Sequence, residues 1–328
     1  MYTNITFELT MLLDSEKFDE LFNRPQNRLS HSAGNKFYDE TMADKGILVT
    51  YHNKQYKKKV QLTVNTNVML SGDEPDECNA EKLVSKLEKH VNGYFNSIYS
   101  LDDFDISKMH LSTDIDVQSR AKVSDYIRIL KHIGRVKGFS PSRNCEIGKY
   151  IGFCLDGNSN GINFRIYNLE RHLKERAKEE TSEHKELNTL ANKSVGLLRV
   201  EVKLVKLAAI RACTDRLVTS DQIEQLCGKG QKMFLNVFRH IVPFGDFYKK
   251  ENAVEIIRKE VTDVKMRRRM IRLVALLPEK KSLMLAQKEL CYRQIDDVMA
   301  EFAEIEVSPV TISKRHDVKM LENIYKFM

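Results

Sequence analysis

The chain changes from strand to helix within residues 161–176, GINFRIYNLERHLKER. Alternation in the first half predicts a strand with Phe164 and Ile166 on one face. Arg165 and Tyr167 then lie on the other face, and beyond Tyr167 the spacing becomes helical and cations accumulate. A phenol beside several cations is suited to meet a phosphodiester. A half-buried strand tyrosine followed by a solvated helix is the simpler structural interpretation.

Composition limits the classes of protein that fit. The 328 residues are 42% hydrophobic, which is enough for a real core in two domains or in one large domain with an appendage. Apolar runs are far too short for a membrane span, and the N-terminus lacks the pattern of a signal peptide. The six cysteines are scattered without a C-x-x-C pair, so neither a zinc site nor a disulfide framework is indicated. We therefore expect a cytoplasmic protein with reduced thiols and no membrane partner.

The net charge of +7 is concentrated near the C-terminus. Residues 228–328 contain 20 Lys and Arg against 14 Asp and Glu. Clustered basic charge is typical of proteins that bind nucleic acid, although it is also compatible with ordinary solubility.

The order of predicted elements indicates an α+β fold. Strands are expected at residues 106–117, 146–155, 162–167 and 195–206, and a hairpin joins residues 46–51 to residues 59–70. Helices between them are expected at residues 14–22, 80–97, 124–133 and 169–191. These helices would cover a mainly antiparallel sheet.

After residue 206 the strand signal fades. Helices are expected at residues 221–226, 229–241, 251–277, 281–304 and 310–326. The sequence thus predicts three parts: an N-terminal segment of unassigned role (1–45), a domain that carries the sheet (46–206) and an all-helical C-terminal domain (207–328).

Two aspartates two residues apart are candidate metal ligands. Asp114 and Asp116 lie in one predicted strand, so both carboxylates point to the same face, which His110 shares. Neighbouring carboxylates repel unless a cation lies between them, and their hard oxygens suit Mg²⁺ or Mn²⁺. A polar strand face that meets solvent, with His110 as a structural residue, is the alternative.

A third carboxylate lies in the most regular strand of the chain, residues 195–206. Glu201 is flanked on its own face by Arg199 and Lys203. This arrangement suits either a metal ligand beside cations or a ladder of surface salt bridges.

Three motifs on three strands resemble those of one family. HLSTDIDV, NFRIYNLERHLKER and LLRVEVKL occur in the order and with the spacing that are typical of rolling-circle replication initiators. The similarity is greatest to the filamentous-phage gene II type and the staphylococcal plasmid type. It covers residues 60–206, with looser similarity in the helical tail.

The resemblance implies a fold of the HUH-endonuclease type and a nickase that acts on a replication origin in DNA. Such an enzyme joins a tyrosine to the 5′-phosphate and leaves a 3′-hydroxyl to prime synthesis; it works with host proteins such as a helicase. Tyr167 would be the nucleophile, and Asp114, Asp116 and Glu201 would hold Mg²⁺ or Mn²⁺. Single- and double-stranded DNA are the implied partners, and a homodimer is left open.

The chain departs from the family pattern in two places. It has no His-apolar-His triplet, which fits a metal held by carboxylates. Leu169 stands where relatives often have a lysine, so Lys174 or Arg171 would take that lysine's role. The cations Arg165 and Lys203 would stabilise the phenolate and the transition state.

The densest basic run lies in the C-terminal part. Its cations are candidates for contacts with DNA phosphates, together with Arg171; they are Lys265, Arg267, Arg268, Arg269 and Arg272. A solvated helix face is the alternative. Residues 308–325 are a candidate for the second helix of a DNA-reading helix pair.

Other classes of function stay open at this stage. A non-catalytic nucleic-acid-binding protein would need only the basic helices. A nuclease that uses metal-activated water would not need Tyr167 and would form no bond with DNA. A conjugative relaxase is close to the preferred class. Tyr150 is a candidate second nucleophile or a packed strand residue.

Overall fold

The computed structural model describes residues 3–25, 27–31, 34–142, 151–179, 184–290 and 295–328. Within these residues ten strands form one sheet in the order β2-β3-β4-β5-β1-β6-β10-β9-β8-β7. Every neighbouring pair in this sheet is antiparallel. The predicted α+β class with a large antiparallel sheet is therefore confirmed.

The described elements have the following bounds. The strands are β1 (Asn4–Leu13), β2 (Leu29–His31), β3 (Lys36–Asp39), β4 (Ile47–Lys54), β5 (Lys57–Asn65), β6 (Asp105–Asp116), β7 (Phe139–Pro141), β8 (Gly152–Gly157), β9 (Ile162–Asn168), β10 (Leu197–Leu204), β11 (Phe247–Tyr248) and β12 (Met320–Leu321). The α-helices are α1 (Ser15–Phe22), α2 (Thr66–Met69), α3 (Ala80–Tyr94), α4 (Arg120–Leu130), α5 (Leu169–Glu179), α6 (His184–Lys193), α7 (Leu207–Arg211), α8 (Thr219–Ile241), α9 (Lys250–Glu260), α10 (Val264–Lys280), α11 (Leu283–Leu290) and α12 (Ile295–Glu304).

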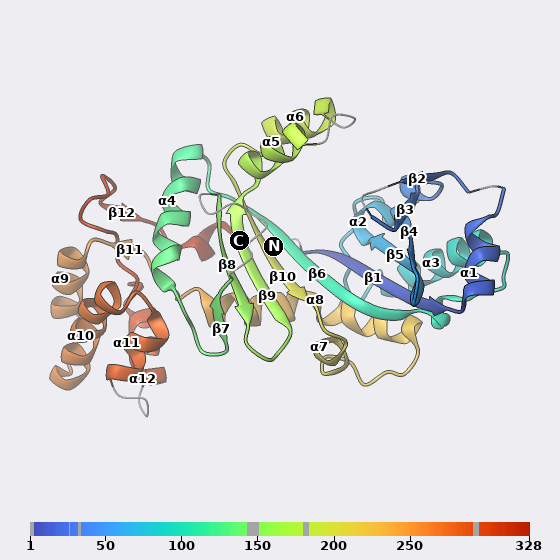
Figure 1. Ribbon diagram of the computed structural model, residues 1–328. Helices are drawn as coiled ribbons and strands as arrows, with labels where there is room; N and C mark the ends of the chain where they lie inside the picture. The colour runs from blue at the N-terminus through green and yellow to red at the C-terminus, as the bar shows by residue number, and fades with distance from the viewer. Residues whose placement is uncertain (1–2, 26, 32–33, 143–150, 180–183, 291–294) are drawn as a thin grey trace.

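Two long strands, β1 and β6, run through the middle of the sheet and join its two halves (Figure 1). Burial alternates along β1, with Ile5, Phe7, Leu9 and Met11 buried. This strand lies inside the predicted N-terminal segment 1–45, whose role the sequence left unassigned. The segment thus supplies a central strand, directly beside the one that carries Asp114.

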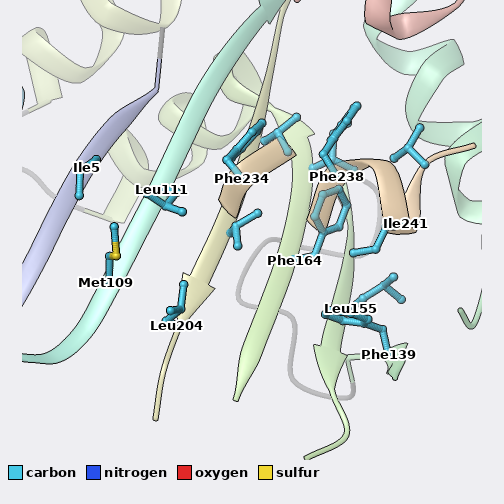
Figure 2. Packing of buried hydrophobic residues seen from close by; sticks show 14 of the residues in the cluster. Ile5, Met109, Leu111, Phe139, Leu155, Phe164, Leu204, Phe234, Phe238 and Ile241 are labelled. Carbon is cyan, nitrogen blue, oxygen red and sulfur yellow. The ribbon is translucent and has the colours of Figure 1, made fainter. Parts of the chain in front are cut away.

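Helix α8 covers the apolar face of the sheet (Figure 2). Its Phe234 and Phe238 point toward strand residues such as Leu111 and Phe164. The approach is close at Gly230, where a Cβ atom would lie 2.8 Å from the side chain of Ile5. Because one face is sealed in this way, the polar side chains of the central strands lie on the opposite face.

The C-terminal helices α9, α10, α11 and α12 gather beside α4, away from β1–β5 (Figure 1). This confirms a helical C-terminal region, but the region is not all-helical as predicted, because β11 and β12 pair within it. None of the helices in the described ranges combines the length and the apolar character needed to cross a lipid bilayer.

Several predicted helix boundaries are wrong. The predicted helix 251–277 is two helices, α9 and α10. Asp263 lies between them and caps α10, because its carboxylate accepts a hydrogen bond from the Met266 N–H at 2.7 Å. The two predicted helices at 221–226 and 229–241 are instead the single helix α8. The N-terminus of α8 is capped by a residue that is distant in sequence: the Asp102 carboxylate accepts a hydrogen bond from the Ser220 N–H at 2.9 Å.

The predicted helix 169–191 is a pair of helices, α5 and α6, that lie side by side (Figure 1). The predicted helix 310–326 is absent, and so is the helix pair proposed for reading DNA. Val307 and Ile312 form bridges with Asp246 and Lys249, so this segment is extended and buried. Only a short strand, β12, and a 3₁₀ turn at Ile324–Phe327 follow it.

The expectation of wholly reduced thiols is also wrong. Cys154 is disulfide-bonded, whereas Cys78, Cys213 and Cys227 are free thiols.

Candidate functional site

Strand pairing brings the three motif strands together as the neighbours β6, β10 and β9. Arg199 on β10 lies opposite Asp114 on β6 and opposite Tyr167 on β9. Two residues along, Glu201 lies opposite Arg165. Since side chains alternate along a strand, these groups share the sheet face that α8 does not cover.

The Tyr167 hydroxyl donates a 2.6 Å hydrogen bond to Oε1 of Glu201. The other carboxylate oxygen of Glu201 lies 3.0 Å from Nζ of Lys203. Burial disfavours the Glu201 anion, but the charge of Lys203 and the hydrogen bond from Tyr167 outweigh it and lower the pKa of Glu201. Glu201 is therefore an ionised acceptor for the phenol proton at neutral pH.

The pKa of Tyr167 is raised, first by burial of the phenol and then by the negative charge of Glu201. The resting phenol is thus protonated. Transfer of this proton to Glu201 is therefore unfavourable in the resting structure.

Arg199 forms a bidentate ion pair with Asp114: its Nε and Nη2 atoms each lie 2.7 Å from a carboxylate oxygen of Asp114. Although burial disfavours its charge, the hydrogen bonds and charge of Asp114 raise the pKa of Arg199. A permanent cation therefore lies beside the phenol.

Helix α5 begins directly after β9 and buries Tyr167, whose side chain is only 3% exposed. Tyr167 belongs to a small apolar cluster, separate from the main core, with Ile151, Cys154 and Leu169. The edge of the His172 ring meets the phenol at 5.0 Å between centroids. Leu169 and His172 of α5 thus pack against the phenol.

A buried carboxylate at the start of α5 fixes this helix. Both oxygens of Glu170 accept from Nε of Arg120, the first residue of α4, at 3.0 and 2.8 Å. Nζ of Lys174 lies 2.6 Å from the same group. The hydrogen bond from Arg120 is the main reason that the pKa of Glu170 is lowered.

Lys174 was expected to assist the nucleophile, but it binds Glu170 and supports α5. Arg171 is exposed on α5, and its N–H is bound by the side chain of Asn168. Arg165 lies on the same sheet face as Tyr167 and lines a neighbouring cavity of about 360 Å³. Lys203 is placed as predicted, against Glu201.

Each of the three predicted metal ligands is bound by other groups. The oxygens of Asp114 bind Arg199, and those of Glu201 bind Tyr167 and Lys203. Asp116 is exposed at the end of β6, where it accepts from the Gln118 N–H at 2.7 Å. In the described ranges no group of three or more His, Cys, Asp or Glu is arranged to hold an ion. The oxygens are of the type that Mg²⁺ and Mn²⁺ prefer, but this arrangement does not fit a metal bound by all three.

His110 lies on the same face, next to Lys203 in the strand register. Its Nε2 atom is 3.5 Å from Oε1 of Glu8. Burial, together with the charge of Lys203, lowers the pKa of His110 to about 4, so the ring is neutral at pH 7. Tyr150, the other candidate, lies outside the described residues.

Sequence reasoning missed Glu8, Arg120 and Glu170. Glu8 was readable in principle, since it alternates with buried residues in β1. Arg120 and Glu170 are 50 residues apart and have no local signal.

The basic run of the C-terminal part lies on the first half of α10. Lys265, Arg268 and Arg272 are exposed, while Arg267 and Arg269 are half-buried. The guanidinium of Arg267 donates to the carbonyl oxygen of Arg258 at 3.3 Å. These cations lie among the C-terminal helices and are not part of the Tyr167 cluster (Figure 1).

No protein-family model matches this chain, and no curated protein sequence does so either.

Proposed function

We propose that this protein nicks DNA by forming a covalent bond between Tyr167 and a 5′-phosphate, and so starts rolling-circle replication of a plasmid or phage. The observation that carries the proposal is the hydrogen bond from Tyr167 to Glu201, next to the Arg199–Asp114 pair on one sheet face. A large antiparallel sheet with this cluster at its centre agrees with a fold of the HUH-endonuclease type.

The proposed reaction uses side chains of this cluster. The Tyr167 oxygen attacks phosphorus while its proton passes to Glu201. The bond from phosphorus to the 3′ oxygen breaks, and that oxygen takes the proton back from Glu201. Because the phosphotyrosine conserves the energy of the cleaved bond, the reverse reaction rejoins the strand without ATP.

Cations beside the phenol would offset the charge that develops on the phosphoryl oxygens. Arg199 and Lys203 are the nearest candidates, since both contact the carboxylates of the cluster. No step of this proposal passes through a metal ion. Binding of Mg²⁺ or Mn²⁺ in the DNA complex stays a prediction.

Substrate access sets a structural condition on the proposal. The 3% exposure of Tyr167 means that α5 has to shift before phosphate can approach. Arg171 is exposed on this helix and is a candidate to contact the DNA backbone. The exposed cations of α10 would bind phosphates of the flanking duplex.

One observation favours a second candidate, a nucleic-acid-binding protein without catalysis. The buried phenol and the closed ion pairs are also what a structural polar cluster needs, since buried polar groups require partners. In that case the protein binds DNA through its basic helices and leaves the DNA intact.

One experiment distinguishes the two candidate functions. Supercoiled DNA of the replicon that carries this gene is incubated with the protein in Mg²⁺, Mn²⁺ or EDTA and analysed on a denaturing gel. The proposal predicts nicked DNA and a shifted band that protease removes, and Tyr167→Phe abolishes this band. Tyr126→Phe is the control, since it also removes a buried hydroxyl, which donates to the Glu322 carbonyl at 2.8 Å. DNA binding without any protease-sensitive band would contradict the proposal and support the second candidate.

A further inference from the structure

A cavity of about 520 Å³ lies where α4, α9, α10 and the C-terminal segment meet. It shares no residue with the Tyr167 cluster. The residues that line it are Lys131, His132, Lys250, Leu277, Pro278, Lys281, Thr311, Ile312, Ser313, Lys314 and Arg315.

The lining is strongly basic. Six of these eleven residues are Lys, Arg or His, and none is acidic. Lys314 is paired with Glu251 at 2.7 Å, on the exposed side of α9. Within the part of the chain that the structure describes, Lys250, Lys281 and Arg315 form no salt bridge. Cations gathered in a concave site repel one another and attract an anion.

The cavity is built from segments that are fixed to one another. Nδ1 of His132 lies 3.2 Å from the carbonyl oxygen of Thr311. The Met284 N–H donates to the carbonyl oxygen of Arg135 at 2.9 Å. At Gly134 a Cβ atom would lie 2.2 Å from the carbonyl oxygen of Lys281, so only glycine permits this close approach. The backbone segments that carry the basic groups are therefore fixed to one another at these contacts, whereas the side chains of Lys281, Lys314 and Arg315 are exposed.

Two further features narrow the chemistry of the ligand. Pro278 lines the cavity with an exposed ring, whereas Leu277 and Ile312, which also line it, are almost fully buried. The cavity thus presents one exposed apolar side chain as well as cations. Helix α9 also begins at Lys250, and the N-terminal end of a helix favours negative charge. A ring system that carries phosphate matches these features better than a bare anion does.

We propose that this cavity binds a nucleoside 5′-phosphate unit, with the phosphate at Lys250, Lys281 and Arg315 and the base against Pro278. The unit comes either from a free nucleotide or from the end of a DNA strand. The proposal does not depend on nicking by Tyr167, since the cavity shares no residue with that cluster.

Isothermal titration calorimetry of the full-length protein tests this site with four probes. They are a deoxynucleoside 5′-monophosphate, the matching nucleoside, inorganic phosphate, and a single-stranded oligonucleotide with a 5′-phosphate. Saturable binding of the monophosphate, about tenfold or more tighter than the nucleoside or phosphate alone, would show that both parts of the ligand are recognised. Saturable binding of the oligonucleotide without binding of the monophosphate would identify a strand end as the source.

Variants then locate the binding. The double variant Lys250→Ala with Arg315→Ala is expected to bind the probe about tenfold or more weakly than the unmodified protein does. Lys259→Ala is the control, because it removes one positive charge from an 82% exposed position on the helix that carries Lys250. Thermal melting checks that each variant is folded. Absence of saturable binding by every probe, or equal affinities in the cavity double variant and the control, would overturn the proposal.

Discussion

The hydroxyl of Tyr167 donates a 2.6 Å hydrogen bond to the carboxylate of Glu201. The acceptor lies on the neighbouring strand, and the register of β9 and β10 places the two residues on the same sheet face. Burial raises the pKa of the phenol, while Lys203 keeps the carboxylate ionised. The pair is thus a protonated phenol next to an ionised carboxylate, which the proposed reaction would use as nucleophile and base.

Removal of the base should slow DNA cleavage without loss of the fold. Glu201→Gln keeps the size of the side chain but cannot take up the phenol proton during attack. We expect the initial rate of formation of the protein–DNA band to fall about 10²-fold or more. Glu306→Gln, on the loop after α12, serves as a control for a lost carboxylate. An unchanged rate in Glu201→Gln would remove Glu201 from the role of base.

Release of α5 should expose Tyr167. Arg120→Ala removes the guanidinium that binds Glu170, and its cost in stability is modest because the Arg120 side chain is 62% exposed. We expect amide hydrogen exchange in α5 to become about tenfold faster, since the helix is held by this ion pair and a small apolar cluster. Lys122→Ala on the same helix α4 is the control. Equal exchange in both variants would show that the ion pair does not fix α5.

The pH dependence of stability should contain a contribution from His110. Its pKa in the folded protein, about 4, is below the usual 6.5, because burial and the charge of Lys203 disfavour its protonated form. The unfolded chain therefore binds the proton more readily, so the free energy of unfolding decreases as the pH falls from 6.5 toward 4. Urea titrations at pH 7 and pH 5 measure this decrease. His110→Gln should reduce it, whereas His240→Gln, at an exposed position, should leave it unchanged. A decrease that His110→Gln does not alter would contradict this account.

Divalent metal should have little effect on the DNA-free protein. Asp114 and Glu201 are already bound to Arg199 and Lys203, so an ion would have to displace these cations. We expect millimolar Mn²⁺ to change the melting temperature by no more than about 1 °C relative to EDTA. A rise of several degrees that disappears in Asp114→Ala with Asp116→Ala would show a metal site that this arrangement does not reveal.

The strands in which apolar and polar residues alternate regularly were predictable from the sequence. Leu198, Val200 and Val202 alternate with Arg199 and Glu201, and that pattern predicted both the strand and its polar face. The same signal was present in β1 but was not recognised, so Glu8 was missed. The alternation in the sequence is therefore sufficient to predict these strands and their polar face.

Features that depend on contacts between distant residues were not readable. The burial of Tyr167 follows from the position of α5, which the Arg120–Glu170 pair fixes across 50 residues. The extended segment after Ser308 resembles a helix in its local sequence, but its apolar residues are used in packing and in bridges near β11. Pairing of Asp114 with Arg199 likewise depends on the register of β6 and β10, which sequence alone does not give.

The central claim is that Tyr167 becomes joined to DNA. The most direct measurement is mass spectrometry of peptides from the protein after incubation with cognate supercoiled DNA and nuclease trimming. We predict a nucleotide phosphate attached to the peptide that contains Tyr167, at the tyrosine oxygen. A nucleotide on any other residue, or nicked DNA without a modified peptide, would contradict the claim.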